Sequence, residues 1–350
     1  MRRRILTLAV ATAAAGALVV PWAEPAPAST PAAAVAPARS VPVPPARSVP
    51  VPPARSVPVP PARSVPAARV VTHFDLAKGQ LPENITLGPD GTAYLTFAAA
   101  RQVAAVDRAG RTRVLATLPA PADGGVATPV LGFALTTGIV RTADGTLYFL
   151  YASGDAASTG LYRMPPGQQP RRIAALPAAG LPNGLALDPT SRTFYVTDSV
   201  LGTISTIPLA GGAARVWSSA SALAATGFLG VNGVKVRGGA VWVTNLDQGT
   251  LLRIPLRQGR AGSVETRATG LVGLDDFTFA PDGRVVATLN GPNTVVGIDG
   301  DGRTRTLLTG ADGLQNPTSV AVRGHTLLVA SAAYTTATDP NLIAVPLHHR

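Results

Sequence analysis

The chain has 350 residues, a formal net charge of +11, 36 glycines, 33 prolines and no cysteine. The absence of cysteine excludes disulfides, cysteine zinc sites and thiol nucleophiles. Residues 1–69 hold eight arginines and one acid, Glu24, so the remainder carries a net charge of only +4. That remainder has no basic patch interleaved with aromatic residues, and we therefore expect no nucleic-acid partner.

The N-terminus has the pattern of an export signal. Arg2, Arg3 and Arg4 precede an apolar stretch at 5–20, and Ala26-Pro-Ala28 offers a small-residue cleavage site. The apolar stretch has 16 residues, whereas a membrane-spanning helix needs roughly 20. We therefore expect a signal peptide at 1–28, a secreted or cell-wall associated mature protein, and no membrane span after cleavage.

Residues 29–68 form a proline-rich segment. The octamer Ala-Arg-Ser-Val-Pro-Val-Pro-Pro starts at Ala38, Ala46 and Ala54, and a truncated copy starts at Ala62. Proline at this density fixes φ and removes hydrogen-bond donors, which predicts an extended polyproline II linker. The linker reads either as a plain spacer or, because each copy presents one arginine, as an arm that contacts the cell wall or a partner.

From residue 69 onward one pattern recurs six times at a spacing of roughly 40–50 residues, which is typical of a propeller. Each copy opens with a polar residue, runs into an apolar strand and turns, often at Pro-Asp-Gly, into an aromatic-bearing second strand. Two more short strands follow, but the sixth copy ends after its third. Arg69–Phe74 supplies the missing strand. The sequence thus predicts an all-β, six-bladed β-propeller over 69–350, closed by an N-terminal strand at about 69–75 and expected to be a monomer.

The polar residues that open the six copies form what we call the column: Glu83, Thr137, Asn183, Asn232, Asp275 and Thr318. The first strand of each blade runs along the central channel, so the column is expected at the channel mouth. Two carboxylates and two carboxamides favour a hard cation, Ca²⁺ before Mg²⁺, which predicts Glu83, Asn183, Asn232 and Asp275 as metal ligands. The adjacent Asp276 leaves the register of the fifth copy open, because the ligand would be Asp276 if that side chain, rather than Asp275, points inward. The alternative is a polar cluster that satisfies its own hydrogen bonds with trapped water.

The stretch Leu181-Pro-Asn-Gly-Leu-Ala-Leu-Asp and the loop Phe194-Tyr-Val-Thr-Asp-Ser resemble the gluconolactonase, regucalcin and senescence-marker-protein propellers, and the related calcium-dependent organophosphate hydrolases. The resemblance extends loosely over 69–350. It implies a divalent metal in the channel, held by a Glu of the first blade, an Asn of the third and an Asp of the fourth. Glu83 and Asn183 match the first two, whereas Asn232 stands where the lactonases carry Asp.

The same resemblance implies a hydrolase that acts on a small lactone or ester, with the metal polarising the carbonyl and a carboxylate as general base. Asp155, Asp198 and Asp247 follow second strands on the mouth face, and Asp198 is the candidate base because Val196-Thr-Asp198-Ser matches the family loop. The alternative role for Asp198 is to cap a turn.

Two other functions stay open at this point. One is a non-catalytic propeller that binds a small ligand, glycan or protein on its loop face. The other is a lyase, which is disfavoured because His73, His325, His348 and His349 all fall outside the predicted channel. The substrate is not defined by the sequence.

Overall fold

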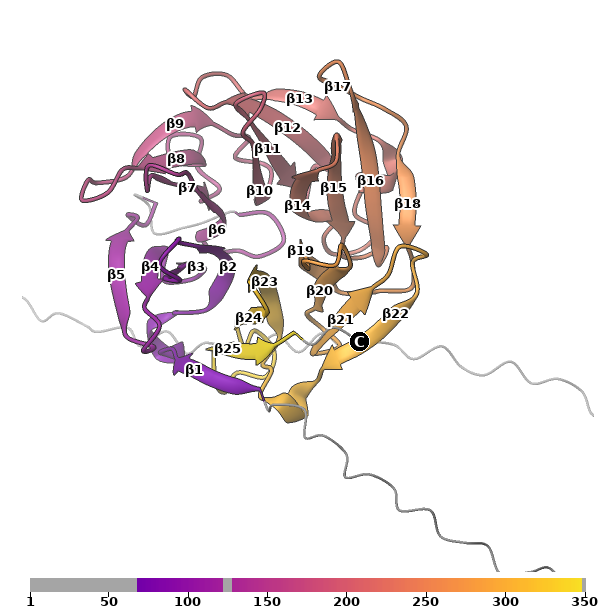
Figure 1. Cartoon of the computed structure of the whole chain (residues 1–350). Helices are drawn as coiled ribbons and strands as arrows, with labels where there is room; N and C mark the ends of the chain where they lie inside the picture. The colour runs from indigo at the N-terminus through magenta and orange to yellow at the C-terminus, as the bar shows by residue number, and fades with distance from the viewer. Residues whose placement is uncertain (1–67, 122–127, 348–350) are drawn as a thin grey trace, which may run out of the picture. The chain divides into compact units, whose positions relative to one another are not determined.

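The computed structural model describes residues 68–121 and 128–347, and these form a ring of small antiparallel sheets (Figure 1). The predicted signal peptide, and all of the predicted linker except Ala68, lie outside the described residues. Within the described ranges no helix has the length and apolar character needed to cross a membrane. The all-β prediction is confirmed, since the regular structure is almost entirely strand.

Each blade is an antiparallel sheet whose strands follow one another from the channel outward. Blade I comprises β2 (Pro82–Leu87), β3 (Ala93–Phe97), β4 (Gln102–Val106) and β5 (Thr112–Thr117). Blade II comprises β6 (Leu135–Arg141), β7 (Leu147–Ala152), β8 (Gly160–Met164) and β9 (Arg171–Ala175). Blade III comprises β10 (Pro182–Asp188), β11 (Thr193–Asp198), β12 (Thr203–Pro208) and β13 (Arg215–Ser218).

Blade IV comprises β14 (Val231–Arg237), β15 (Ala240–Asn245), β16 (Thr250–Arg257) and β18 (Glu265–Ala268), with the short β17 (Arg260–Ala261) paired to β16. Blade V comprises β19 (Leu274–Phe279), β20 (Val285–Leu289), β21 (Thr294–Ile298) and β22 (Thr304–Leu308). Blade VI comprises β23 (Pro317–Arg323), β24 (Thr326–Ser331) and β25 (Asn341–Pro346). In the part of the chain that the structure describes, three single-turn 3-10 helices lie in connections: η1 (Leu76–Lys78), η2 (Ser221–Leu223) and η3 (Gly310–Asp312).

The last blade is closed by the N-terminal strand, as the sequence predicted. β1 (Arg69–His73) pairs antiparallel with β25, with Arg69 opposite Ala344 and His73 opposite Asn341. This places the first strand beside the last in the ring (Figure 1). Closure covers a strand edge that an open array would expose.

Apolar residues fill the space between neighbouring blades. The alternation along each strand sends side chains to both faces of a blade, and each face packs on the next blade. One cluster, for example, joins Phe149 of blade II to Val103 of blade I, and another joins Ile204 of blade III to Val243 of blade IV. Clusters of this kind occupy every interface around the ring, which is why the blades form one unit.

A β-bulge marks the start of every innermost strand, at the column residue. The register shifts between Pro182 and Leu185 in β10 and between Val231 and Val234 in β14, and at the equivalent points of the other four blades. A bulge leaves one residue unpaired in the ladder and redirects its side chain. The bulge therefore frees the column residue and its neighbour from the regular pairing.

Threonine hydroxyls connect these bulges from blade to blade, and we call this set the threonine ring. At every interface one hydroxyl donates to a backbone carbonyl of the next blade. The donors, in blade order, are Thr96, Thr137, Thr197, Thr244, Thr288 and Thr318. Thr197 and Thr244 also accept the bulge N–H of Gly184 and Gly233, at 2.8 and 2.7 Å. Two column residues, Thr137 and Thr318, thus serve the ring itself.

Replacing Thr244 with valine should lower the free energy of unfolding by about 2 kcal/mol, because it strands a buried N–H that now donates at 2.7 Å and removes the donor to the Asp275 carbonyl at 2.5 Å. Valine keeps the shape of the side chain. Thr304→Val, at an exposed position of β22, is the matched control and should change stability by less than about 0.5 kcal/mol. Urea unfolding measures both, and equal effects would contradict a role for the threonine ring.

Candidate functional site at the channel mouth

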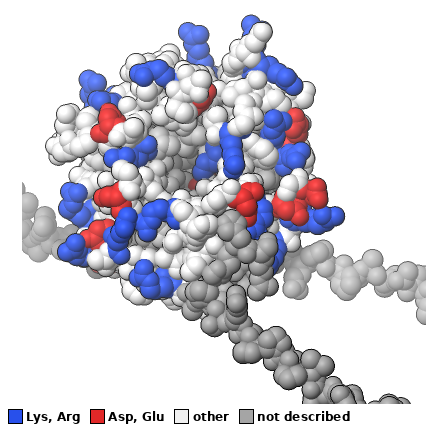
Figure 2. Space-filling model, viewed as in Figure 1, with Lys and Arg blue, Asp and Glu red and all other residues white. Residues whose placement is uncertain are grey.

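The column residues gather where the innermost strands begin. All six are buried, and the ring has a hollow at its centre (Figure 2). The position after the column is glycine in blades II, III and IV, and a Cβ added at Gly184 would lie 2.3 Å from the Asn232 carbonyl oxygen. In blades V, VI and I the same position carries Asp276, Ser319 and Asn84. One half of the channel is therefore lined by close-packed backbone and the other half by polar side chains.

Glu83 is buried at the start of the channel, with 9% of its surface exposed. The Tyr334 hydroxyl, from the loop between β24 and β25, donates to its Oε2. The pKa of the Glu83 carboxyl is raised to about 7, chiefly by burial and also by the charge of the nearby Asp276, while the hydrogen bond from Tyr334 opposes the shift. Burial and the Glu83 charge raise the pKa of Tyr334 well above its ordinary value, so its phenol stays protonated as a donor.

Asp275 lies in the same group of charges. Asn290 Nδ2 donates to its Oδ2 at 3.4 Å, and Asn232 also hydrogen-bonds its carboxyl. Burial, followed by the charges of Glu83 and Asp276, raises the pKa of Asp275 well above its usual range. Two buried carboxyls thus share one mouth. Neither forms an ion pair with any residue in 68–121 or 128–347.

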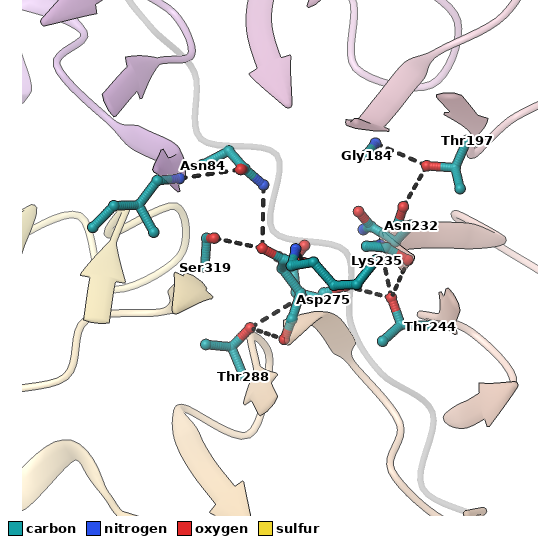
Figure 3. Close-up of polar contacts among 12 residues, drawn as sticks. Asn84, Gly184, Thr197, Asn232, Lys235, Thr244, Asp275, Thr288 and Ser319 are labelled. Atoms are coloured by element: carbon teal, nitrogen blue, oxygen red, sulfur yellow. Dashed lines mark hydrogen bonds and ion pairs between the residues drawn. The ribbon is translucent and has the colours of Figure 1, made fainter. Parts of the chain in front are cut away.

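Asp276 is neutralised within the protein. Lys235 Nζ contacts its Oδ1 at 2.6 Å, while Ser319 Oγ and Asn84 Nδ2 donate to its Oδ2 at 2.5 and 3.3 Å (Figure 3). The donors come from blades IV, VI and I, so one carboxylate ties three other blades together across the channel. Both carboxyls, at 275 and 276, are buried, with Asp275 contacted by Asn290 and Asp276 ion-paired to Lys235. The choice between them as a metal ligand stays a prediction.

Asn183 and Asn232 keep amide oxygens available. Asn183 Nδ2 donates to Ser199 Oγ at 3.1 Å, and the amide of Asn232 bonds the Asp275 carboxyl. In both residues the nitrogen is used, which leaves Oδ1 as an acceptor side for a further group. Thr137 and Thr318 differ, because their hydroxyls donate at 2.8 Å to the carbonyls of Pro182 and Pro82 and the side chains are fully buried.

Asp198 holds a turn. Its Oδ1 accepts the N–H groups of Leu181, Val200 and Leu201 at 2.9, 3.1 and 2.9 Å. Burial raises the pKa of the carboxyl despite these three bonds. Asp247 has a similar position, since its Oδ2 accepts three backbone N–H groups of residues 226–228. These contacts match the alternative role for Asp198, which is to cap a turn. A catalytic role for Asp198 stays a prediction.

The donor set fits a hard cation with few charged ligands. No group of three or more His, Cys, Asp or Glu side chains in the described part of the chain could hold a metal ion. A cation at the mouth would therefore depend on Glu83 and Asp275 together with the amide oxygens of Asn183 and Asn232. Burial, with the neighbouring carboxyl charges, raises the pKa of both carboxyls, so ionising both of them at the mouth is unfavourable without a compensating group. A divalent cation, or a shared proton, would supply that compensation.

Several participants in this site escaped the sequence prediction, and two of them are Lys235 and Tyr334. Lys235 occupies a position where the other inner strands carry Thr86, Val140, Ala186, Thr278 and Ala321. This contrast is the sequence signal that could have identified Lys235, because a lysine at a position where the other blades carry small or apolar side chains needs a buried partner for its charge. Tyr334 lies in a loop without repeat equivalents, so no alignment of the copies could assign it to Glu83. The two histidines within the described residues lie elsewhere, with His73 in β1 beside Asp339 and His325 in the turn after β23.

No protein-family model and no curated protein matches the chain. Solved structures do match it in fold. A calcium-binding protein, regucalcin, from Agrobacterium tumefaciens superposes with a TM-score of 0.59 at 19% identity, covering 81% of this chain and 98% of its own. The PQQ-bound aldose sugar dehydrogenase of Streptomyces coelicolor gives 0.57 at 15% identity, covering 82% and 99%.

A catalytically inactive variant of virginiamycin B lyase from Staphylococcus aureus, in complex with quinupristin, gives a TM-score of 0.56 at 16% identity, covering 77% of this chain and 82% of the lyase chain. At such identities the similarity establishes the fold alone. The chain is a six-bladed β-propeller. The neighbours include a calcium-binding protein, a lyase and a dehydrogenase, so the propeller fold that this chain shares supports several kinds of chemistry.

Proposed function

We propose that the protein is a secreted hydrolase that binds a divalent cation of the Ca²⁺ type at the channel mouth and acts on a small lactone or ester. The observation that supports this is the pair of buried carboxyls, Glu83 and Asp275, which lack an ion-pair partner among the described residues and have raised pKa values. Export by the peptide at 1–28 and cell-wall contact through 29–68 belong to the same proposal.

In this proposal Glu83 and Asp275 supply charge, and Asn183 and Asn232 supply neutral oxygens. A bound cation would polarise the substrate carbonyl and lower the pKa of a bound water. Tyr334 has a protonated phenol at the mouth, which can donate a hydrogen bond to a substrate oxygen once Glu83 is otherwise engaged. Asp198 is the proposed base, but its Oδ1 is used by the turn, so only Oδ2 could accept a proton.

A second candidate is a non-catalytic propeller that binds a small ligand at the same mouth. It is favoured by the substitution of Asn232 for the aspartate expected of a lactonase and by the engagement of Asp198 in its turn. Both candidates use the same polar cluster. They differ in whether a chemical step follows binding.

Calcium titration tests the proposed site. At a free Ca²⁺ concentration about thirty times Kd, the free energy of unfolding should rise by about 2 kcal/mol. Glu83→Gln should abolish the increase, because it removes one of two charged ligands. Asp301→Asn, which changes a carboxyl that is 77% exposed, should keep it. Calorimetry and thermal unfolding measure the effect. If the wild-type protein shows no calcium-linked stabilisation, the metal-dependent function is wrong.

A panel of lactones and esters then separates the two candidates. The enzyme should hydrolyse at least one of them in the presence of Ca²⁺ and lose that activity with chelator and in Glu83→Gln. The binding protein should bind Ca²⁺ without turnover of any panel member.

A further inference from the structure

A pocket of about 280 Å³ lies between blades IV and V, away from the channel mouth. Arg237, at the end of β14, lines it and stands five residues beyond Asn232. At the rise of an extended strand this separates the pocket from the column by about 16 Å. Neither the column nor Asp198 contributes to its wall, so the pocket is a separate feature of the ring.

The floor of the pocket is apolar. Trp242 and Phe279 meet edge to face, with ring centroids 5.4 Å apart and an interplanar angle of 83°. Both rings are half-buried and both line the pocket, together with the buried side chains of Leu251, Val285 and Ile298. Edge-to-face packing fixes the two rings, so the floor is preformed. A rigid apolar surface of this kind favours a flat ring or a short aliphatic body over a polymer.

Three guanidinium groups stand around this floor. Arg237 lies over the Phe279 ring at 4.5 Å, and Arg253 lies 5.9 Å from the Trp242 ring. Arg253 is neutralised by Glu265, at 2.8 Å. Arg267 donates from Nη2 to the Gly300 carbonyl at 3.1 Å.

Two of the three positive charges remain uncompensated. Within 68–121 and 128–347, neither Arg237 nor Arg267 has an ion-pair partner. Asp299 also lines the pocket, and its Oδ1 accepts the backbone N–H groups of Asp301 and Arg303 at 2.9 Å, so the lining has three arginines against this one carboxylate. The pocket is therefore positive at its rim and apolar at its floor.

We propose that this pocket binds a small anion with an apolar body, of the aromatic carboxylate class. The carboxylate would accept from Arg237 and Arg267, since arginine presents paired N–H donors that match a carboxylate. The ring would lie on Trp242 and Phe279. A volume of about 280 Å³ accommodates one or two fused rings and is near the lower limit of small-molecule sites. The site is independent of the cation proposed at the mouth.

The test uses the mature form that the proposed cleavage after Ala28 would give, which lacks Trp22, with 2-naphthoate as the probe and its uncharged analogue 2-naphthamide as the comparison. Trp217→Phe leaves Trp242 as the tryptophan of the propeller, and its fluorescence reports occupancy of the floor. Naphthoate should quench it and bind with a submillimolar Kd. Arg237→Gln and Arg267→Gln should each weaken binding about tenfold or more, because each removes a charge-assisted hydrogen bond. Arg305→Gln, at an exposed position of β22, should leave the Kd unchanged.

Three results would overturn the proposal: equal affinity for naphthoate and naphthamide, equal weakening by Arg305→Gln, or no saturable quenching of Trp242. Circular dichroism of each variant identifies any that fails to fold. In that event the lysine substitutions at the same positions take their place; because they retain the charge and lose the paired donors, they should still weaken naphthoate binding relative to the wild type, and Arg305→Lys should not.

Discussion

Replacing Lys235 with methionine is expected to lower the free energy of unfolding by about 3–5 kcal/mol. The substitution leaves Asp276 without its ion-pair partner in a site where only 3% of its side chain is exposed. Ser319 and Asn84 would still donate to Oδ2, but no cation would remain on Oδ1. The loss of Lys235 packing over the Phe277 ring, now at 5.4 Å, adds a smaller contribution. Urea unfolding at neutral pH measures the change.

The double variant Lys235→Met with Asp276→Asn is the decisive control. Asparagine removes the buried charge, so most of the stability should return. Asp276→Asn alone should cost only about 1 kcal/mol, because the Lys235 side chain is 29% exposed and its ammonium can reach water. Equal destabilisation by the two single variants, or no recovery in the double variant, would show that the pair does not account for the cost.

The fold was predictable because its information is repeated. Six copies of one pattern set the number of blades, and the absence of a fourth strand after Leu342-Ile-Ala-Val-Pro pointed to Arg69–Phe74 as the closing strand. The pairing of β1 with β25 confirms that inference. Any single copy is a weak signal, since a short apolar run also fits a buried helix. Repetition at a fixed spacing removed the ambiguity.

The candidate site was less predictable, since it depends on what differs between copies. The alignment found the column, but it did not show what Thr137 and Thr318, which were not among the predicted ligands, do there. The structure shows that their hydroxyls donate to Pro182 and Pro82 carbonyls of the next blade. A threonine side chain is short enough for its hydroxyl to bond the backbone of the next blade, whereas the longer side chains of the column extend past that backbone. The distance between neighbouring blades decides this, and sequence alone does not give it.

Lys235 and Tyr334 show a second limit on what the sequence can predict about the candidate site. Each reaches a partner in another blade, with 41 residues between Lys235 and Asp276 and 251 between Tyr334 and Glu83. Such pairs depend on the radius of the channel, which no local pattern encodes. Of the three carboxyls at the mouth, the protein neutralises one, Asp276, through its ion pair with Lys235. The other two, Glu83 and Asp275, have no ion-pair partner among the described residues. This difference makes the stability of the propeller sensitive to pH.

In the absence of divalent cations, raising the pH from about 5 to 8 is expected to destabilise the wild-type protein, with Glu83 contributing about 3 kcal/mol. Its pKa is about 7 in the folded protein against an ordinary value of 4.5. Between these values the folded protein holds a proton that the unfolded chain has lost, so stability falls as the pH rises and levels off above 7. Asp275 and Asp198, whose pKa values are also raised, change stability in the same direction.

Glu83→Gln removes this contribution together with the part of the Asp275 pKa shift that the Glu83 charge causes. Glutamine cannot ionise, so the variant should be as stable as the wild type near pH 5 and more stable at pH 8. Exposed acids with lowered pKa values, such as Asp90 and Asp107, act in the opposite direction but equally in both proteins, so they cancel in the difference. Asp301→Asn should follow the wild-type curve. Urea unfolding from pH 5 to 8 in chelated buffer gives the curves, and parallel curves for wild type and Glu83→Gln would contradict the prediction.

If the mouth binds Ca²⁺, the cation should stabilise the wild type more at pH 8 than at pH 5, because it competes with the proton that the two carboxyls otherwise retain.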